Sequence, residues 1–515
     1  MKTIYTILSS ALVGVALMCT SCDSQLDQVN PNAATEDTFW QTEKDFELAL
    51  TSCYTPLKNP LEGGYHGTRG VMMRICRADE VEFRNDISDI YAAQNFTNSI
   101  GNSLTQGMFY QFYNALYRTN SVMQQLELKK GVFSDEFIDK VKGECLFIRG
   151  YYLFQLGKEF KNAPLRLTAS QSSSTFPLAK SSQAEIWEQA IKDLTTAASL
   201  LPQKNSVIGK PTCGAAYAAL GKIYLYQKEY DKAKSVLEPL TKSPYTYRLV
   251  DDYEWNFDDT HENNEESIFE LLIDYYSGGT DIWGNGELIN SAQTTSRARE
   301  YAASCAQGWY EAQPTQQMMD IFWAEKDKDG NYDYRARMNA AWNYPGCMYY
   351  TKTFQEQFPN NLDSYWILKY QNWWREKEDK VQYSSINDRA IRYADVLLML
   401  AECNLFTNNL QAAVDYINQI RRRANLNDYS QAMTQDAIFE DLEHQRAIEF
   451  FVEGERFYDL RRWGLLEKRL QTCNTIRYNQ YMTGKQASGV NKYDYYPIPS
   501  KEIETNPLCE PNEGW

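Results

Sequence analysis

Histidine is scarce in this chain of 515 residues, which contains only His66, His261 and His444. A catalytic base or a metal site built on imidazole therefore has few residues to draw on. The G-x-S-x-G motif of many serine hydrolases is also absent. These absences leave carboxylate chemistry open, but no catalytic residue, metal or cofactor is predicted.

Positive charge is also in deficit, because 68 Asp and Glu residues outnumber 52 Lys and Arg residues and the formal net charge is −16. Nucleic acids and anionic membrane surfaces bind proteins through clustered Lys and Arg, which replace counterions. We therefore exclude nucleic acid as a partner. The hydrophobic fraction of 43% is typical of a globular body.

Long apolar runs are missing except at the N-terminus, where residues 1–22 read "MKTIYTILSSALVGVALMCTSC". Lys2 precedes an apolar run over residues 4–18, and the small residues Thr20 and Ser21 stand before Cys22. This is the order of regions in a secretory signal peptide. The run is shorter than the roughly 20 residues that a membrane-spanning helix needs.

The pair Cys19 and Cys22 has two interpretations. A C-x-x-C can be a redox pair or half of a metal site, but either needs a strand-turn-helix context or a second ligand pair, and neither is present. The segment instead resembles the lipobox of bacterial lipoproteins, although Cys19 stands where leucine is usual. The resemblance implies a signal peptide over 1–21, acylation of Cys22, and a polar lipidated tether over 22–38.

Three short stretches imitate known sites but lack a required residue. "HENNE" (261–265) has Glu where a zincin needs its second His, and "GKPT" (209–212) lacks the upstream Gly of a P-loop. "EKDKDGNYD" (325–333) approaches an EF-hand, but Ala336 stands where the bidentate acid belongs. The nine cysteines after Cys22 are scattered, and no disulfide is predicted.

Two segments, 213–240 and 392–424, have the spacing of tetratricopeptide repeats, which are helical hairpins. In each segment two small residues stand 12 positions apart and allow the paired helices to approach closely. These residues are Gly221 with Ala233 and Ala401 with Ala413.

Weaker helix pairs are predicted at 39–58 with 106–128 and at 134–161 with 183–201. About four hairpins predict a mainly α fold, a solenoid scaffold whose apolar faces are buried by stacking. Long irregular loops rich in aromatic residues would overlie it.

The stretch 246–385 differs from the rest of the chain. Gly, Pro, Asn and aromatic residues alternate there without helical periodicity, as in "GWYEAQPTQQMMD" and "AAWNYPGCMYY". Long loops within a compact protein are usually functional. We therefore predict a helical region over 39–245, a loop-rich insertion over 246–385 that carries the ligand surface, and a C-terminal region over 386–515.

The run "QRAIEFFVEGERFYDLRRWG" (445–464) carries alternating charges at spacings of three and four residues. This spacing predicts a stripe along one face of a single helix. It favours a salt-bridged seam to a neighbouring helix over a ligand-gripping ladder. The stripe residues are Glu449, Glu453, Arg456, Asp459 and Arg462.

Several segments in order along the chain resemble the SusD/RagB family of surface lipoproteins. They are "NPNAATEDTFWQTEKDFELALTSCY", "GECLFIRGYYLFQLGKEFKNAPL", "RYADVLLMLAEC" with "INQIRRRA", "IEFFVEGERFYDLRRWG" and "YYPIPSKEIETNP". One departure is Gln445, where the family usually has Glu. The likeness spans nearly the whole chain after Cys22.

This resemblance implies a function as well as an α-helical fold with four tetratricopeptide-like units. The chain would be anchored by lipid to the outer membrane and exposed at the cell surface. It would capture an oligosaccharide or polysaccharide and close like a lid over a partner, a SusC-like TonB-dependent transporter. It would hydrolyse nothing, because the transporter is energised from the inner membrane.

Sugars present apolar faces that stack on aromatic rings, and hydroxyls that hydrogen bond to polar side chains. In the family the ligand surface is built from an early and a mid-chain loop region, and its residues vary. By region alone, we expect three aromatic platforms and three polar contacts. These are Tyr276, Trp283 and Trp309, with Asp79, Arg84 and Asn98.

Other functions remain open from the sequence. The same scaffold could bind peptides or another nutrient, and the acidic net charge favours neutral or basic ligands. A surface enzyme with an unrecognised carboxylate pair would turn over its glycan. A solenoid that only binds proteins would lack exposed aromatic platforms.

Overall fold

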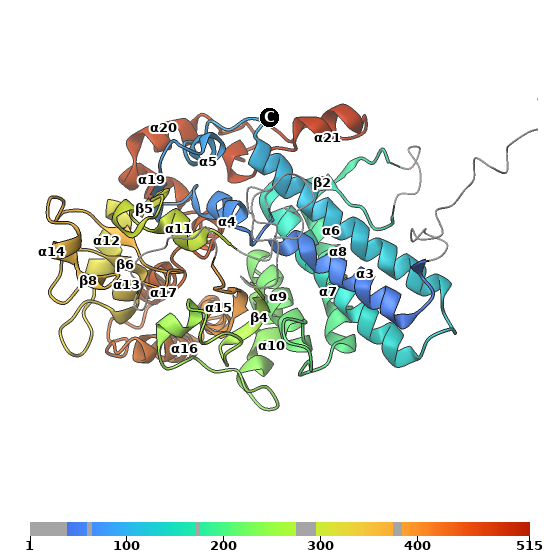
Figure 1. Cartoon of the computed structure of the whole chain (residues 1–515), viewed down its shortest axis with the longest axis horizontal. Helices are drawn as coiled ribbons and strands as arrows, with labels where there is room; N and C mark the ends of the chain where they lie inside the picture. The colour runs from blue at the N-terminus through green and yellow to red at the C-terminus, as the bar shows by residue number, and fades with distance from the viewer. Residues whose placement is uncertain (1–38, 59–63, 170–175, 274–294, 374–383) are drawn as a thin grey trace, which may run out of the picture. The chain divides into compact units, whose positions relative to one another are not determined.

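The computed structural model describes residues 39–58, 64–169, 176–273, 295–373 and 384–515 (Figure 1). The chain divides into a short unit that ends at Leu48 and a main unit, Ala49–Trp515. In the short unit, the Asp45 carboxylate accepts the backbone N–H of Thr42 at 2.7 Å, and the rings of Trp40 and Phe46 lie 5.0 Å apart.

The described chain is mainly helical, as the sequence predicts. The longer helices are α3 (Glu43–Lys58), α6 (Ser103–Leu128), α7 (Asp135–Phe160), α8 (Gln183–Leu200), α9 (Cys213–Tyr226), α15 (Tyr393–Phe406), α16 (Leu410–Arg423) and α17 (Gln435–Glu449). The shorter ones are α4 (Thr68–Ile75), α5 (Ser88–Gln94), α10 (Tyr230–Leu237), α11 (Arg297–Tyr301), α12 (Gln316–Trp323), α13 (Tyr334–Asn339), α14 (Phe354–Gln357), α18 (Arg456–Trp463), α19 (Leu466–Cys473), α20 (Thr475–Met482) and α21 (Ser500–Thr505).

The strands are short and pair antiparallel in twos. The pairs are β1 (Val81–Phe83) with β5 (Ala312–Pro314), β2 (Ala163–Pro164) with β3 (Lys180–Ser181), β4 (Ser267–Leu271) with β10 (Asp388–Arg392), β6 (Ala340–Ala341) with β9 (Trp366–Ile367), and β7 (Met348–Tyr349) with β8 (Lys352–Thr353). Two of these pairs, β1–β5 and β4–β10, join segments more than 100 residues apart, and two others, β6–β9 and β7–β8, lie within the 295–373 stretch. The strand pairs therefore position loops and do not build a larger sheet.

The helices stack in chain order from α6 to α10 and continue with α15, α16 and α17, as Figure 1 shows in part. Hairpins α9–α10 and α15–α16 are the two strongly predicted repeat units, and α7 packs along α8 as expected. The fourth predicted pair, 39–58 with 106–128, corresponds to helices α3 and α6. There Arg118 of α6 donates to the Ser52 carbonyl of α3 at 2.6 Å. The predicted tetratricopeptide-like architecture is confirmed.

Local sequence explains where these helices begin. Ser134 accepts the N–H of Phe137 at 3.2 Å at the start of α7. Ser182 and Glu185 form a reciprocal capping box at the start of α8. Such caps satisfy backbone donors that have no partner within the helix.

Glycine sets the separation of helices within the stack. A Cβ on Gly221 would lie 2.4 Å from a Leu237 methyl carbon, so α9 and α10 touch through glycine as predicted. The sequence analysis did not anticipate a row of glycines on α7 that faces α8. A Cβ on Gly143, Gly150 or Gly157 would press against Leu200, Leu194 or Trp187, respectively.

The single helix predicted over 445–464 is wrong, because α17 ends at Glu449 and α18 begins at Arg456. Between them Val452 and Gly454 both have positive φ, at +53° and +83°. An oxygen of the buried Glu80 carboxyl group accepts the N–H of Val452 at 3.0 Å and so holds the break. Because the chain turns here, the charged residues of the predicted stripe that precede the turn and those that follow it do not lie on one helix face.

The stripe residues pair with partners from several elements: Glu449 and Glu453 share Arg392 and Lys369, and within the stripe Asp459 pairs with Arg462 at 2.9 Å. The carboxylate of Glu449 accepts from Arg392 at 2.6 Å and Arg335 at 3.2 Å, and also from Arg423. The backbone carbonyl of Glu449 accepts from Tyr253 at 2.8 Å and from Lys369 at 3.2 Å. The other four residues pair as follows: Glu453 with Lys369 and Arg392, Arg456 with Asp79 and Glu443, Asp459 with Arg446, and Arg462 with Glu402.

Replacing Glu449 by Gln leaves three buried guanidinium groups without their common anion. We expect Glu449→Gln to lower the free energy of unfolding by about 3–5 kcal/mol, which is typical of breaking a buried ion pair. Urea denaturation measures this change. Glu440→Gln, at an exposed position of the same helix, is the matched control and should change stability by no more than about 0.5 kcal/mol. Equal stability of the two variants would contradict the role of Glu449.

Glu80 makes stability depend on pH. Burial raises the pKa of its carboxyl from 4.5 to about 8. The folded state therefore keeps a proton that the unfolded state releases, so stability falls as pH rises from about 4.5 to 8. Glu80→Gln should reduce this fall by on the order of 1.4 kcal/mol per pH unit in that range.

Unfolding free energies measured at several pH values between 5 and 8 test the role of Glu80. Glu82→Gln, at an exposed position of strand β1 two residues after Glu80, should keep the dependence of the unfolding free energy on pH that the parent protein shows. If the unfolding free energy of Glu80→Gln changed with pH as steeply as that of the parent protein, the Glu80 carboxyl would not titrate as described.

Candidate functional site

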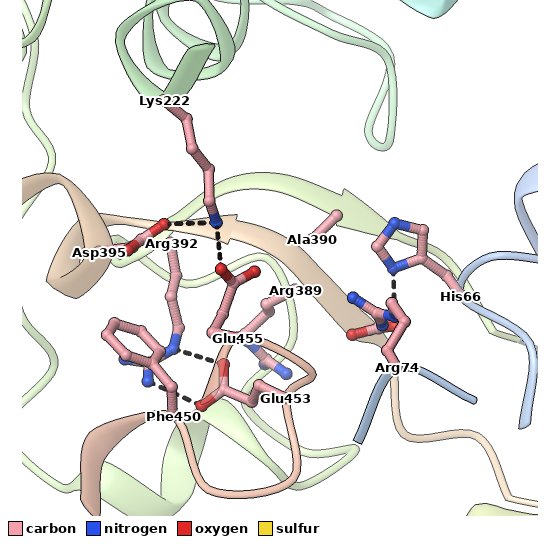
Figure 2. Close-up of a pocket in the computed structure, with 11 residues that line it drawn as sticks. His66, Arg74, Lys222, Arg389, Ala390, Arg392, Asp395, Phe450, Glu453 and Glu455 are labelled. Atoms are coloured by element: carbon pink, nitrogen blue, oxygen red, sulfur yellow. Dashed lines mark hydrogen bonds and ion pairs between the residues drawn. The ribbon is translucent and has the colours of Figure 1, made fainter. Parts of the chain in front are cut away.

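A cavity lined by charged side chains lies within the fold, next to strand β10 (Figure 2). Lys222 lies between Asp395 at 3.0 Å and Glu455 at 2.8 Å, and Arg392 contacts Glu453 at 2.8 Å. The volume of this cavity is about 20 Å³, whereas pockets that bind drug-sized molecules measure about 300–1,000 Å³. The cavity is therefore too small for a sugar ring.

A surface with partly exposed aromatic rings forms where β1 pairs with β5. Arg84 follows β1, and Trp309 and Tyr310 precede β5. The Arg84 guanidinium donates to the Trp309 carbonyl at 2.8 Å and lies 3.9 Å above the centre of the Tyr310 ring. Both rings are partly exposed. We call Arg84, Trp309 and Tyr310 the ring surface.

The backbone before β5 fixes the two rings in place. The N–H groups of Trp309 and Tyr310 donate to the carbonyls of Arg299 at 2.8 Å and Ala302 at 3.0 Å. Gly308 makes this turn possible, because a Cβ there would lie 1.9 Å from the Ala302 carbonyl oxygen. The Tyr310 ring also meets Trp366 edge-on at 6.2 Å, which supports it from the core.

The ring surface combines apolar and charged groups. The Arg84 side chain is 36% exposed and forms an ion pair with Asp86. In the neighbouring helix α11, burial raises the pKa of Glu300 to about 7, although Arg69 lies 3.1 Å away. Burial also raises the pKa of Glu311. The exposed groups can stack on an apolar ligand face and hydrogen bond to hydroxyls.

The structure brings two of the six predicted ligand residues, Arg84 and Trp309, into direct contact. Asp79 is 1% exposed, and its carboxylate accepts two hydrogen bonds of 2.9 Å from Arg456. It is therefore a structural ion-pair partner in this conformation, without a surface for ligand. Asn98 is 8% exposed and lies in the interior as well.

Tyr276 and Trp283 lie outside the described residues, as do Cys22 and the tether. Tyr310 is the member of the ring surface that the sequence analysis missed. Its signal was its place beside Trp309 in "GWYEAQP". Adjacent residues of a regular strand point to opposite faces, but Tyr310 has a φ of +42°, which the letters do not reveal.

Two further properties bear on the described parts of the chain. Among the residues in the described ranges, no group of three or more His, Cys, Asp or Glu side chains is placed to hold a metal ion. No helix within those ranges combines the length and apolar character needed to cross a membrane.

Residues 265–515 match the model of the SusD family, and residues 24–225 match a model described as starch-binding associating with outer membrane. A crystal structure of a SusD superfamily protein from Bacteroides vulgatus is 66% identical, with a TM-score of 0.87. The match covers 93% of this chain and 100% of that one.

Curated relatives agree with these matches. SusD-like protein P2 of Formosa agariphila is 24% identical, over 95% of this chain and 96% of that protein. Starch-binding protein SusD of Bacteroides thetaiotaomicron is 31% identical over 155 residues, which are 29% of this chain and 26% of that protein. The resemblance found in the sequence motifs is confirmed: this chain belongs to the SusD family.

Proposed function

We propose that this chain binds a glycan at the cell surface and delivers it to a TonB-dependent outer-membrane transporter, which it covers like a lid. The observation that carries this proposal is the ring surface. Two partly exposed rings lie side by side in sequence, and the partly exposed Arg84 guanidinium is fixed against the Tyr310 ring and the Trp309 carbonyl. Aromatic faces with a few fixed polar groups are what a sugar ring requires.

The relatives support a carbohydrate as the ligand. One matching family model carries the description starch-binding, and so does the name of the Bacteroides thetaiotaomicron relative. The ring surface is built from segments near residues 84 and 309, one early and one mid-chain, as the family resemblance led us to expect.

We further propose that the chain is anchored to the outer membrane by acyl chains on Cys22. The signal-like N-terminus and the lipobox support this anchor, as does the family description that mentions the outer membrane. Two or more acyl chains make attachment stable. The polar tether over 22–38 would then link the membrane to the globular body.

The chain acts by binding, without hydrolysis, in this proposal. A glycosidase needs one carboxyl group as acid and a second as base or nucleophile on either side of the substrate. Near the ring surface, Glu300 and Glu311 are at most 8% exposed. The exposed acid, Asp86, pairs with Arg84.

Loss of the indole ring tests the ring surface. We expect Trp309→Ala to weaken glycan binding at least about tenfold, or 1.4 kcal/mol, because an aromatic platform is removed. Affinity electrophoresis identifies a bound glycan from a panel of polysaccharides and peptides, and calorimetry measures its affinity. Tyr117→Ala removes a 54% exposed ring from helix α6 and is the matched control.

The pattern of results decides among the functions. Glycan binding without turnover that Trp309→Ala weakens and Tyr117→Ala preserves supports the proposal. Binding of peptides alone would make the ligand a peptide. Turnover of the bound glycan would make the protein an enzyme.

A second variant tests the loop and leaves its rings in place. Gly308→Ala adds a Cβ where the Ala302 carbonyl oxygen would lie 1.9 Å away, so the loop must move. We expect glycan affinity to fall at least about tenfold, with the far-ultraviolet circular dichroism spectrum unchanged. Full affinity in Gly308→Ala would show that the ligand does not depend on this loop.

A further inference from the structure

A buried arginine in helix α4 forms no ion pair with a carboxylate in the part of the chain that the structure describes. Arg74 is 4% exposed, and among the described residues its Nε has no hydrogen-bond partner. Its guanidinium lies 4.6 Å from the centre of the Tyr65 ring. In contrast, nearby Arg297 and Arg392 face carboxylates at 3.2 and 2.8 Å. A buried charge without an opposite charge is costly.

A second cation, Lys158 of helix α7, faces the same space. Its side chain is 1% exposed, and its Nζ lies 4.0 Å from the centre of the Tyr458 ring. No carboxylate within the described ranges forms an ion pair with it. Arg74, Lys158 and Lys222 all line one cavity, which adjoins the cavity in Figure 2 and shares Arg74 and Lys222 with it.

The acids that line this cavity already have partners. Asp395 accepts from Lys222 at 3.0 Å and from Arg446 at 2.9 Å. Glu455 lies 2.8 Å from Lys222. The three lining cations therefore exceed the two lining acids by one charge when Lys158 is protonated.

The neighbouring groups do not remove this excess. Asp388 lines the adjoining cavity, but it pairs with Arg297 at 3.2 Å and with His66 at 2.9 Å. Burial lowers the pKa of His66 to about 4, so the imidazole is neutral at pH 7. Glu159, next to Lys158, pairs with Arg77 at 3.1 Å.

The size of the cavity selects the kind of anion. Its volume is about 20 Å³, and a single water molecule needs about 10–15 Å³ of such volume. Phosphate, sulfate and carboxylate ligands are larger than this space allows. We propose that this cavity binds one monatomic anion, chloride in ordinary salt, between Arg74, Lys158 and Lys222.

Anion binding and the charge of Lys158 depend on each other. Burial lowers the pKa of Lys158 to about 7; Glu455 and Glu159 act against this shift, and Lys222 and Arg74 add to it. A bound chloride favours the protonated amine and raises its pKa. Chloride therefore binds more tightly at pH 6 than at pH 9, where the amine is neutral.

Crystals of the protein soaked in sodium bromide test the site directly. We expect an anomalous difference peak in the cavity between Arg74 and Lys158. Thermal unfolding of the full mature chain gives a second test, in sodium chloride and in sodium gluconate of equal ionic strength. We expect the Tm in chloride to be higher by about 2–4 °C at pH 6, and the difference to shrink at pH 9.

Two variants and a control connect the salt effect to the site. Lys158→Met and Arg74→Met should each abolish the difference in Tm between the two salts, whatever their own stability. Lys161→Met, at a partly exposed position just after α7, should keep the difference in Tm between chloride and gluconate. A cavity without a bromide peak, together with equal Tm values in both salts at pH 6, would show that it holds water only and would overturn the proposal.

Discussion

The carboxylate of Glu449 forms ion pairs with three buried guanidinium groups that come from different parts of the chain. Arg335 belongs to α13, Arg392 ends β10, and Arg423 ends α16. Because Glu449 is itself the last residue of α17, one anion ties the repeat stack to the stretch that carries the short strands. Ion pairs of this kind cost desolvation, which is repaid only when all partners are in place. The arrangement therefore specifies one relative position of these elements.

The helical stack could be predicted from the sequence because its signals are local. Small residues 12 positions apart marked both strong hairpins, and the contact of Gly221 with Leu237 shows the physical reason. The glycine row on α7 was missed, although Gly143, Gly150 and Gly157 are evenly spaced by seven residues. Spacing alone does not reveal which neighbour a helix face will meet.

The turn between α17 and α18 could not be inferred from the charge spacing. The spacing of three and four residues continues across 449–462 without interruption, as it would in a helix. The turn depends on Glu80, a residue about 370 positions earlier, whose carboxylate binds the Val452 N–H. Gly454 was the one local signal. For the same reason, the letters could not separate exposed Arg84 from buried Asp79 and Asn98, since burial depends on distant partners.

The β1–β5 pair joins residues 81–83 to residues 312–314 by main-chain hydrogen bonds, and the ring surface lies at its end. Main-chain pairing makes almost no demand on the identity of the side chains that it carries. The residues beside this ladder can therefore change from one protein to another while the helical stack and the Glu449 contacts stay as they are. A single scaffold can in this way present different recognition chemistry to different nutrients, and its ligand would be read from a few positions beside two short strands.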